Sequence, residues 1–203
     1  MTFGIHHNSV QPTGTSKLMF RRLVALLITL SLMSTSTRAV LAQPASKGPG
    51  EYTIKAAYLY SLLRYIKWPP TAFAGADSPL VIGIYGEIPA ELGASLKYYE
   101  ERKQIEGRSI TVRHTQTWQE VAGCHMVFVR RSVDPNSLSE LVAQCSKAPV
   151  LFVGETDGFL ESGGAVSFSI IAMKVKIHLA PKVAESKGIK PSAWLLRAAG
   201  VPN

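Results

Sequence analysis

The chain has 203 residues, 46% of them hydrophobic, and a formal net charge of +8 at pH 7. This length suits one domain with a proper core, together with a targeting segment. Outside the N-terminal segment the basic residues are spread along the chain, so the charge does not predict a nucleic-acid-binding protein.

The N-terminus has the pattern of a secretory signal peptide. Basic residues between positions 17 and 22 precede an apolar run of 11 residues, 23–33, and small residues follow up to Ala42. We predict cleavage after Ala42, so that residues 1–42 are removed on export. An uncleaved N-terminal anchor is the alternative, although 11 apolar residues are few for a bilayer span. The remaining 161 residues carry 18 basic and 14 acidic side chains.

The mature chain opens with a Pro/Gly/Ser linker, residues 43–50, and then a predicted helix over 51–67. Tyr58 and Leu62 lie on one face of this helix, but other apolar residues widen that face around most of its circumference. Arg64 stays on the wetter side. A helix this apolar needs a second surface besides its own sheet, and we therefore predict a homodimer.

A proline ends this first helix. Pro69 pushes Trp68 out of the α region of the backbone, so we expect the helix to stop there. The Trp68 ring is expected to be buried, with its indole N–H bound to a hydrogen-bond acceptor.

Strands and helices then alternate along the chain. This alternation predicts one α/β domain of three layers, with a mostly parallel sheet, an antiparallel extension and helices on both faces. Two helix starts are marked by capping residues, a capping box at Thr117 and Glu120 and an Asp134–Pro135 start. We expect strands over 79–86, 109–114, 125–129, 149–154 and two within 163–179, and helices over 90–99, 117–123, 134–145, 181–186 and 191–198.

Two cysteines, Cys124 and Cys145, are present. Each precedes a predicted parallel strand, so both are expected at the same edge of the sheet. In an exported chain this favours one disulfide, which would stabilise the folded state by about 3 kcal/mol on the chain-entropy estimate. Two buried free thiols are the alternative.

The motifs of known catalytic sites are missing or incomplete. The stretch "DGFLESGG" resembles a serine protease nucleophile loop only in its last residues, and no β-barrel pattern accompanies it. "GIYGEIP" lacks the full dinucleotide fingerprint, and the chain has no P-loop. We therefore predict no enzyme activity, no cofactor and no metal site.

Two segments could take part in recognition. Glu155 and Asp157 lie on a loop after a predicted strand, the usual place for ligands in open α/β sheets. In "KVKIHL" the alternation places Lys176 and His178 on one strand face, where they could form a small anion site. A solvated strand face is the alternative for this pair.

The chain resembles the YfiR-type periplasmic proteins over about residues 51–200. The resemblance is distributed over a series of segments in order, with mild departures at 179–181 and 192–194. These segments are "YTIKAAYLYSLLRYIKWP", "LVIGIYG", "GRSITVRH", "GCHMVFV", "APVLFVGETDGFLESGGAVSF" and "KVKIHLAPKVAESKGIKPSAWLLRAAG".

The resemblance implies a function without catalysis. It implies a periplasmic binding protein that represses an inner-membrane diguanylate cyclase through the cyclase's periplasmic part, lowering cyclic-di-GMP and biofilm formation. It also implies sequestration by an outer-membrane OmpA-like lipoprotein, and redox control through disulfides. A periplasmic small-molecule sensor that feeds a histidine kinase or a transporter is the alternative. Contacts to a ligand or partner are predicted from Arg64, Trp68, Glu155, Asp157, Phe159, Lys176 and His178.

Overall fold

The computed structural model describes residues 50–199, so the predicted signal peptide and nearly all of the predicted linker lie outside the described residues. The helices are α2 (Glu51–Tyr65), η1 (Pro70–Ala72, a 3-10 turn), α3 (Ala90–Arg102), α4 (Trp118–Ala122), α5 (Pro135–Gln144), α6 (Pro181–Ser186) and α7 (Ala193–Ala198). The strands are β1 (Ile66–Lys67), β2 (Leu80–Tyr85), β3 (Gln104–Ile105), β4 (Arg108–Thr115), β5 (Met126–Val129), β6 (Leu151–Gly154), β7 (Val166–Ile171), β8 (Lys174–Leu179) and β9 (Lys190–Pro191).

One sheet of seven strands forms the middle layer, in the order β3-β4-β2-β5-β6-β7-β8. The five central strands run parallel, and β3 and β8 join the two ends antiparallel. Helices α3, α4 and α5 lie in the connections between β2, β4, β5 and β6, because a crossover must return the chain to the same end of the sheet, and a loop without a helix leads from β6 to β7. The predicted mostly parallel sheet with an antiparallel extension is confirmed.

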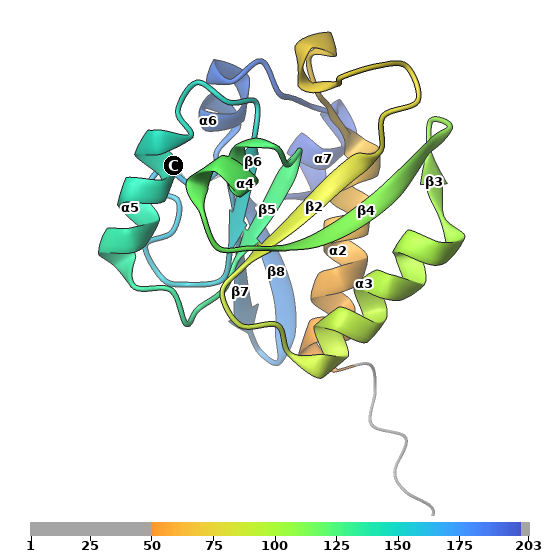
Figure 1. The fold of residues 1–203 in the computed structure, drawn as a ribbon. Helices are drawn as coiled ribbons and strands as arrows, with labels where there is room; N and C mark the ends of the chain where they lie inside the picture. Colours follow the sequence, from red (N-terminus) through yellow and green to blue (C-terminus); the bar gives the residue numbers. More distant parts are fainter. Residues whose placement is uncertain (1–49, 200–203) are drawn as a thin grey trace, which may run out of the picture. The chain divides into compact units, whose positions relative to one another are not determined.

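Helices cover both faces of the sheet, as the strand pattern predicts (Figure 1). On β2 the side chains of Ile82 and Ile84 join a core with α2 and α3, whereas Val81 joins a core with α4 and α5. Strands buried on both faces are uniformly apolar, which explains the continuous "LVIGIY" run. The predicted capping box of α4 and the Asp134 cap of α5 are both present.

The first helix ends at Tyr65, two residues earlier than the sequence predicts. Ile66 and Lys67 are extended and pair with β9, and the Ser192 N–H donates to the Tyr65 carbonyl at 2.8 Å. Pairing with the C-terminal segment therefore unwinds the last half-turn before Pro69 can act. Periodicity cannot reveal such a contact, because the partner lies more than 120 residues away.

Candidate functional site: an open groove beside the edge strand

A groove of about 740 Å³ lies between α2, β8 and α7. Its wall on α2 is apolar and aromatic, and includes Tyr58 and Tyr65. Across the groove the Tyr65 ring stacks on the half-exposed Trp194 ring of α7, with 4.3 Å between centroids. This groove, named here the α2–β8 groove, borders part of the apolar face of the first helix. The other apolar residues of the helix have partners within the domain, since α2 contacts α3, α7 and β8.

The β7–β8 hairpin ends beside the groove and exposes apolar side chains. Ile170 and Ile171 are about half exposed, at 51% and 52%, and Met173 is 97% exposed. Because β8 is the last strand of its sheet, it presents an edge that could pair with a further strand. Edges of this kind are usually protected by charge, and here Lys174 and Lys176 supply it.

The turn of this hairpin has a strained backbone. Ala172 and Met173 both adopt positive φ, at 49° and 60°, in the two-residue connection between β7 and β8. Such turns favour Asn-Gly, because glycine has no Cβ penalty at positive φ. Strain of this kind persists where another constraint selects the residue, and it often marks a functional segment. The exposed Met173 is therefore the strongest single indication of a contact surface in the groove region.

The predicted Lys176–His178 pair alternates along β8 with the buried Val175 and Leu179, and both residues line the α2–β8 groove. On β8, Val175 and Leu179 are buried as predicted. His178 Nε2 lies 2.8 Å from Ser169 Oγ on β7. His178 also lines a small pocket of about 240 Å³ that contains Asp157. The structure thus brings Asp157 and His178 together, and both line the same hollow beside β8.

Glu155 does not face solvent, as a recognition residue would. Its carboxylate is fully buried and pairs with Lys55 and Arg130, and its Oε2 lies 3.4 Å from Arg131. Glu51 of α2 joins the same cluster through Lys55 and Arg131. Burial acts to raise the pKa of Glu155, but hydrogen bonds from Lys55 and Arg131 hold that pKa below its ordinary value. Glu155 therefore fastens the start of α2 to the carboxyl end of the sheet.

Phe159 and Trp68 are both buried in the core, and each also lines a pocket. Phe159 is 1% exposed, and a Cβ on Gly154 or Gly164 would lie 2.2 Å from its ring atoms. Both glycines are thus required by the ring between them. Trp68 is buried, and its indole N–H donates to the His125 carbonyl at 2.9 Å, which confirms the predicted indole hydrogen bond.

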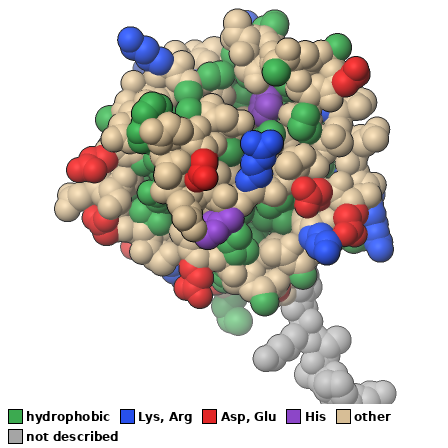
Figure 2. Space-filling model, in the orientation of Figure 1, with side chains coloured by type: hydrophobic (Ala, Val, Ile, Leu, Met, Phe, Trp, Pro, Cys, Tyr) green, Lys and Arg blue, Asp and Glu red, His purple; other side chains and the backbone are tan. Residues whose placement is uncertain are grey.

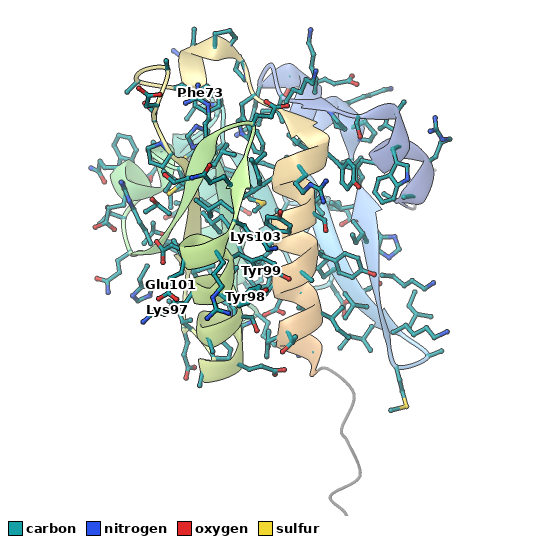
Figure 3. The ribbon with its side chains drawn as sticks, turned by 90° about the vertical axis from the view of Figure 1, so that its right-hand side faces the viewer. Phe73, Lys97, Tyr98, Tyr99, Glu101 and Lys103 are labelled. Atoms are coloured by element: carbon teal, nitrogen blue, oxygen red, sulfur yellow. The ribbon has the colours of Figure 1, made fainter. Side chains whose placement is uncertain are left out.

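Arg64 is exposed on α2, near aromatic rings but outside the lining of the groove. Its guanidinium carbon lies 6.0 Å from the Tyr60 ring centroid and 5.8 Å from that of Tyr65. Tyr60 stacks on Tyr99 of α3, with 4.6 Å between centroids. Figure 3 shows Tyr98 and Tyr99 beside α2, on the outer layer of the domain.

The predicted disulfide is not formed in the structure, where Cys124 and Cys145 are both free and buried. Each thiol is directed to a backbone carbonyl, Cys124 to that of Glu120 at 3.3 Å and Cys145 to that of Trp118 at 3.6 Å. Burial raises the pKa of Cys124 to about 11 and also raises that of Cys145. The two residues do share one apolar cluster under α4 and α5.

Sequence reasoning identified Lys176 and His178, which line the groove, but it missed the groove's apolar and aromatic residues. Their signal is weak, because aromatic residues on a helix usually indicate core. The clearest trace is "IIAM", an apolar run at the position of a hairpin turn, where polar residues and glycine are expected. The groove residues missed in this way are Tyr58, Tyr65, Ile171, Met173 and Trp194.

The described part of the chain contains neither a cluster of candidate metal ligands nor a membrane-spanning helix. Across residues 50–199, no group of three or more His, Cys, Asp and Glu side chains is placed to hold a metal ion. No helix in the same range is long and apolar enough to cross a bilayer. The face of the molecule in Figure 2 intersperses acidic and basic side chains, without a field of one sign.

Comparison with solved structures gives distant likenesses. One is a conserved domain protein from Vibrio cholerae O1 biovar El Tor, with 11% identity and a TM-score of 0.48 over 75% of this chain and 60% of that one. Another is the ABC domain in complex with L-Trp from Streptococcus pneumoniae, with 14% identity and a TM-score of 0.47 over 74% and 59%. The chain thus spans about 60% of the length of these structures. No curated protein matches it.

The family comparison is more extensive. The model of DUF4154, described as YfiR/HmsC-like, matches residues 52–200, which include nearly all of the described domain. Members of this family are in general periplasmic regulators of diguanylate cyclases, and they are regulatory rather than catalytic. The chain therefore belongs to the YfiR/HmsC-like family.

Proposed function

We propose that this protein represses an inner-membrane diguanylate cyclase by binding the cyclase's periplasmic part at the α2–β8 groove and the adjoining hairpin tip. Repression lowers cyclic-di-GMP and, with it, biofilm formation. The observation that carries the proposal is Met173, a 97% exposed methionine on a strained two-residue turn. Methionine is adaptable and is favoured at surfaces that bind protein partners.

The surroundings of Met173 support a protein partner rather than a small molecule. The groove continues the exposed hairpin with aromatic side chains, and Tyr and Trp are enriched at interfaces. Trp194 is 52% exposed over the groove, where a partner could cover it. The free edge of β8 could accept an extended segment, since edge strands add further strands through backbone hydrogen bonds.

The charges beside the groove favour a partner segment that is both apolar and acidic. Lys174 and Lys176 are exposed on β8, and His178 lies on the same strand face. The partner's apolar side chains would fill the groove, and its carboxylates would face the lysines. Sequestration by an OmpA-like outer-membrane lipoprotein would then act by competing for this surface. Export by cleavage of residues 1–42 would bring the protein into the same compartment as both partners.

Deletion of the gene tests the function directly. We expect cellular cyclic-di-GMP to rise on deletion and to return to the parental level on complementation with the exported protein. A complementing protein that carries Met173→Gly should fail to restore the low level, whereas Ala172→Gly in the same turn should restore it. Unchanged cyclic-di-GMP on deletion would contradict the proposal and favour a small-molecule sensor.

The homodimer predicted from the apolar first helix would use part of the same surface. Light scattering of the purified protein at micromolar concentration measures the mass. A monomeric mass would leave the groove free for the cyclase, and it would remove the homodimer from the proposal.

A further inference from the structure

A second pocket, of about 310 Å³, lies where β2 and β4 begin. Its walls combine two aromatic rings, Trp68 and Phe73, with aliphatic side chains that include Leu80 and Ile105. None of its lining residues belongs to the α2–β8 groove. This cavity, named here the Arg108 pocket, is at the small end of the range for ligand sites, so it suits a compact ligand.

The charged groups of this pocket favour an anion. Arg108 and Lys67 line it together with one acidic residue, Glu106. The Arg108 guanidinium lies over the Phe73 ring, 4.0 Å from its centroid, and its Nη1 donates to the carbonyls of Gly75 and Ser78. Both of these hydrogen bonds use one nitrogen, whereas a guanidinium has five N–H donors in a geometry that matches a carboxylate.

A buried histidine contacts the two aromatic rings. The His125 ring centroid is 4.7 Å from that of Phe73 and 5.9 Å from that of Trp68, and the residue is 5% exposed. His125 Nδ1 accepts a hydrogen bond from the Val81 N–H at 3.1 Å, so the proton of the neutral ring is on Nε2. Among the described residues, Nε2 has no hydrogen-bond partner.

A buried donor without a partner is rare in folded proteins, and each case needs an explanation. The His125 ring contacts Phe73, which lines the pocket, is half-buried and lies in the loop between η1 and β2. Figure 3 places Phe73 in that loop, well apart from the tyrosines of α3. The Phe73 ring is in contact with both the imidazole and the guanidinium, so we expect that a shift of this ring would bring both donors to one ligand.

We propose that the Arg108 pocket binds a compact apolar carboxylate. The carboxylate pairs with the Arg108 guanidinium and, once Phe73 has moved, accepts the Nε2–H proton of His125 in a hydrogen bond. The apolar body of the ligand rests against Trp68 and the aliphatic wall. This site is separate from the proposed cyclase-binding surface and does not depend on that function.

Phenylacetate is a suitable probe, with 2-phenylethanol as the neutral comparison of similar size. Calorimetry on the protein purified from the periplasm should show saturable 1:1 binding of phenylacetate, at least about tenfold tighter than 2-phenylethanol. The imidazole ¹⁵N resonances of His125 should shift on addition of phenylacetate. Arg108→Gln should weaken phenylacetate by about tenfold or more and leave 2-phenylethanol unchanged.

The matched control is Arg102→Gln, which removes an exposed arginine that lies over the Tyr98 ring on α3. This variant should bind phenylacetate as the parent does, and Arg108→Lys should restore part of the affinity. Absence of saturable phenylacetate binding at millimolar concentration would overturn the proposal. So would binding that Arg108→Gln leaves intact, or equal affinity for the alcohol, since neither result fits an anion site at Arg108.

Discussion

Two regions of the molecule differ in how far their side chains are buried and paired within the domain. One is the carboxyl end of the central strands, and the other is the β8 edge. Beyond β5 and β6, the buried Glu155 carboxylate pairs with two buried cations, Lys55 and Arg130. Beside β8, apolar side chains are exposed and a groove stays open. The carboxyl end of the sheet is closed by the protein's own charges, whereas the β8 side keeps an open groove.

This difference departs from the common use of such sheets. In doubly wound sheets, ligands usually bind beyond the carboxyl ends of the strands, where the strand order reverses. Here the reversal lies between β2 and β5, and Arg130 follows β5 at that point. Its Nε donates to the Glu87 carbonyl at 2.8 Å, and a Cβ on Gly86 would lie 2.9 Å from its own Cβ. The usual ligand position is therefore filled by an internal side chain, which is consistent with our proposal that binding takes place at the edge strand.

The largest expected effect on stability comes from breaking the buried ion pairs of Glu155 at the carboxyl end of the sheet. Glu155→Gln removes the carboxylate that two buried cations share, and we expect the free energy of unfolding to fall by about 3–5 kcal/mol. Denaturation in urea measures it. The control is Glu101→Gln, which breaks an exposed pair with Lys97 and should change stability by no more than about 0.5 kcal/mol. A loss below about 1 kcal/mol for Glu155→Gln would show that the cluster does not fasten α2 to the sheet.

The second effect is a pH dependence from His125, at the opposite end of the strands. Burial and then the charge of Arg108 lower the pKa of His125 from 6.5 to about 4. The unfolded chain therefore binds a proton that the folded chain does not, between those two values. Stability is full above about pH 6.5 and falls as the pH drops toward 4, by about 3 kcal/mol at most.

The variant His125→Asn separates this slope from acid effects of the carboxylates. Asparagine keeps an acceptor for the Val81 N–H but does not titrate, so the fall between pH 6.5 and 4.5 should disappear. Glu155, whose pKa is lowered, contributes stability that is lost only below the ordinary glutamate range. An unchanged slope in His125→Asn would mean that another group titrates in this window.

Much of this architecture follows from local pattern, but the contrast between the two regions does not. The capping box of α4, the alternation of β8 and the apolar run of β2 depend on neighbours in sequence, and each was predictable. The end of α2 and the burial of Glu155 depend on contacts with distant segments, such as β9 and Lys55. Glu155 has the sequence context of a loop carboxylate, and only the tertiary pairing with three cations shows that it is structural.

The third effect concerns the β7–β8 hairpin beside the groove, where one substitution should weaken partner binding without lowering the free energy of unfolding. Met173→Gly removes the exposed side chain and also relieves a positive φ, so the protein should gain about 0.5–1 kcal/mol in stability. Binding to the cyclase's periplasmic part should nevertheless weaken by about tenfold or more, because exposed anchors dominate interface energy.

Ala172→Gly is the matched control, since it relieves the same kind of backbone strain and keeps the methionine. It should stabilise the protein to a similar degree and leave binding unchanged. If both variants weaken binding equally, the turn conformation rather than the Met173 side chain is what the partner requires. If neither weakens binding, the hairpin tip lies outside the interface.

The smallest effect concerns the α4–α5 side, where both thiols are free and buried in the structure. Because burial raises the pKa of each thiol, Cys124 and Cys145 should not react with thiol reagents in the folded protein at neutral pH. In unfolded, non-reduced protein from the periplasm, two free thiols per chain should titrate, and a reductant should change the free energy of unfolding by less than about 0.5 kcal/mol.

If no thiols titrate in the unfolded protein, this expectation is contradicted. The bridge inferred from the sequence would then exist in the exported protein, and its reduction should cost about 3 kcal/mol, the chain-entropy value for its loop. In that case the side away from the groove would be closed covalently, which would sharpen the contrast with the open β8 edge.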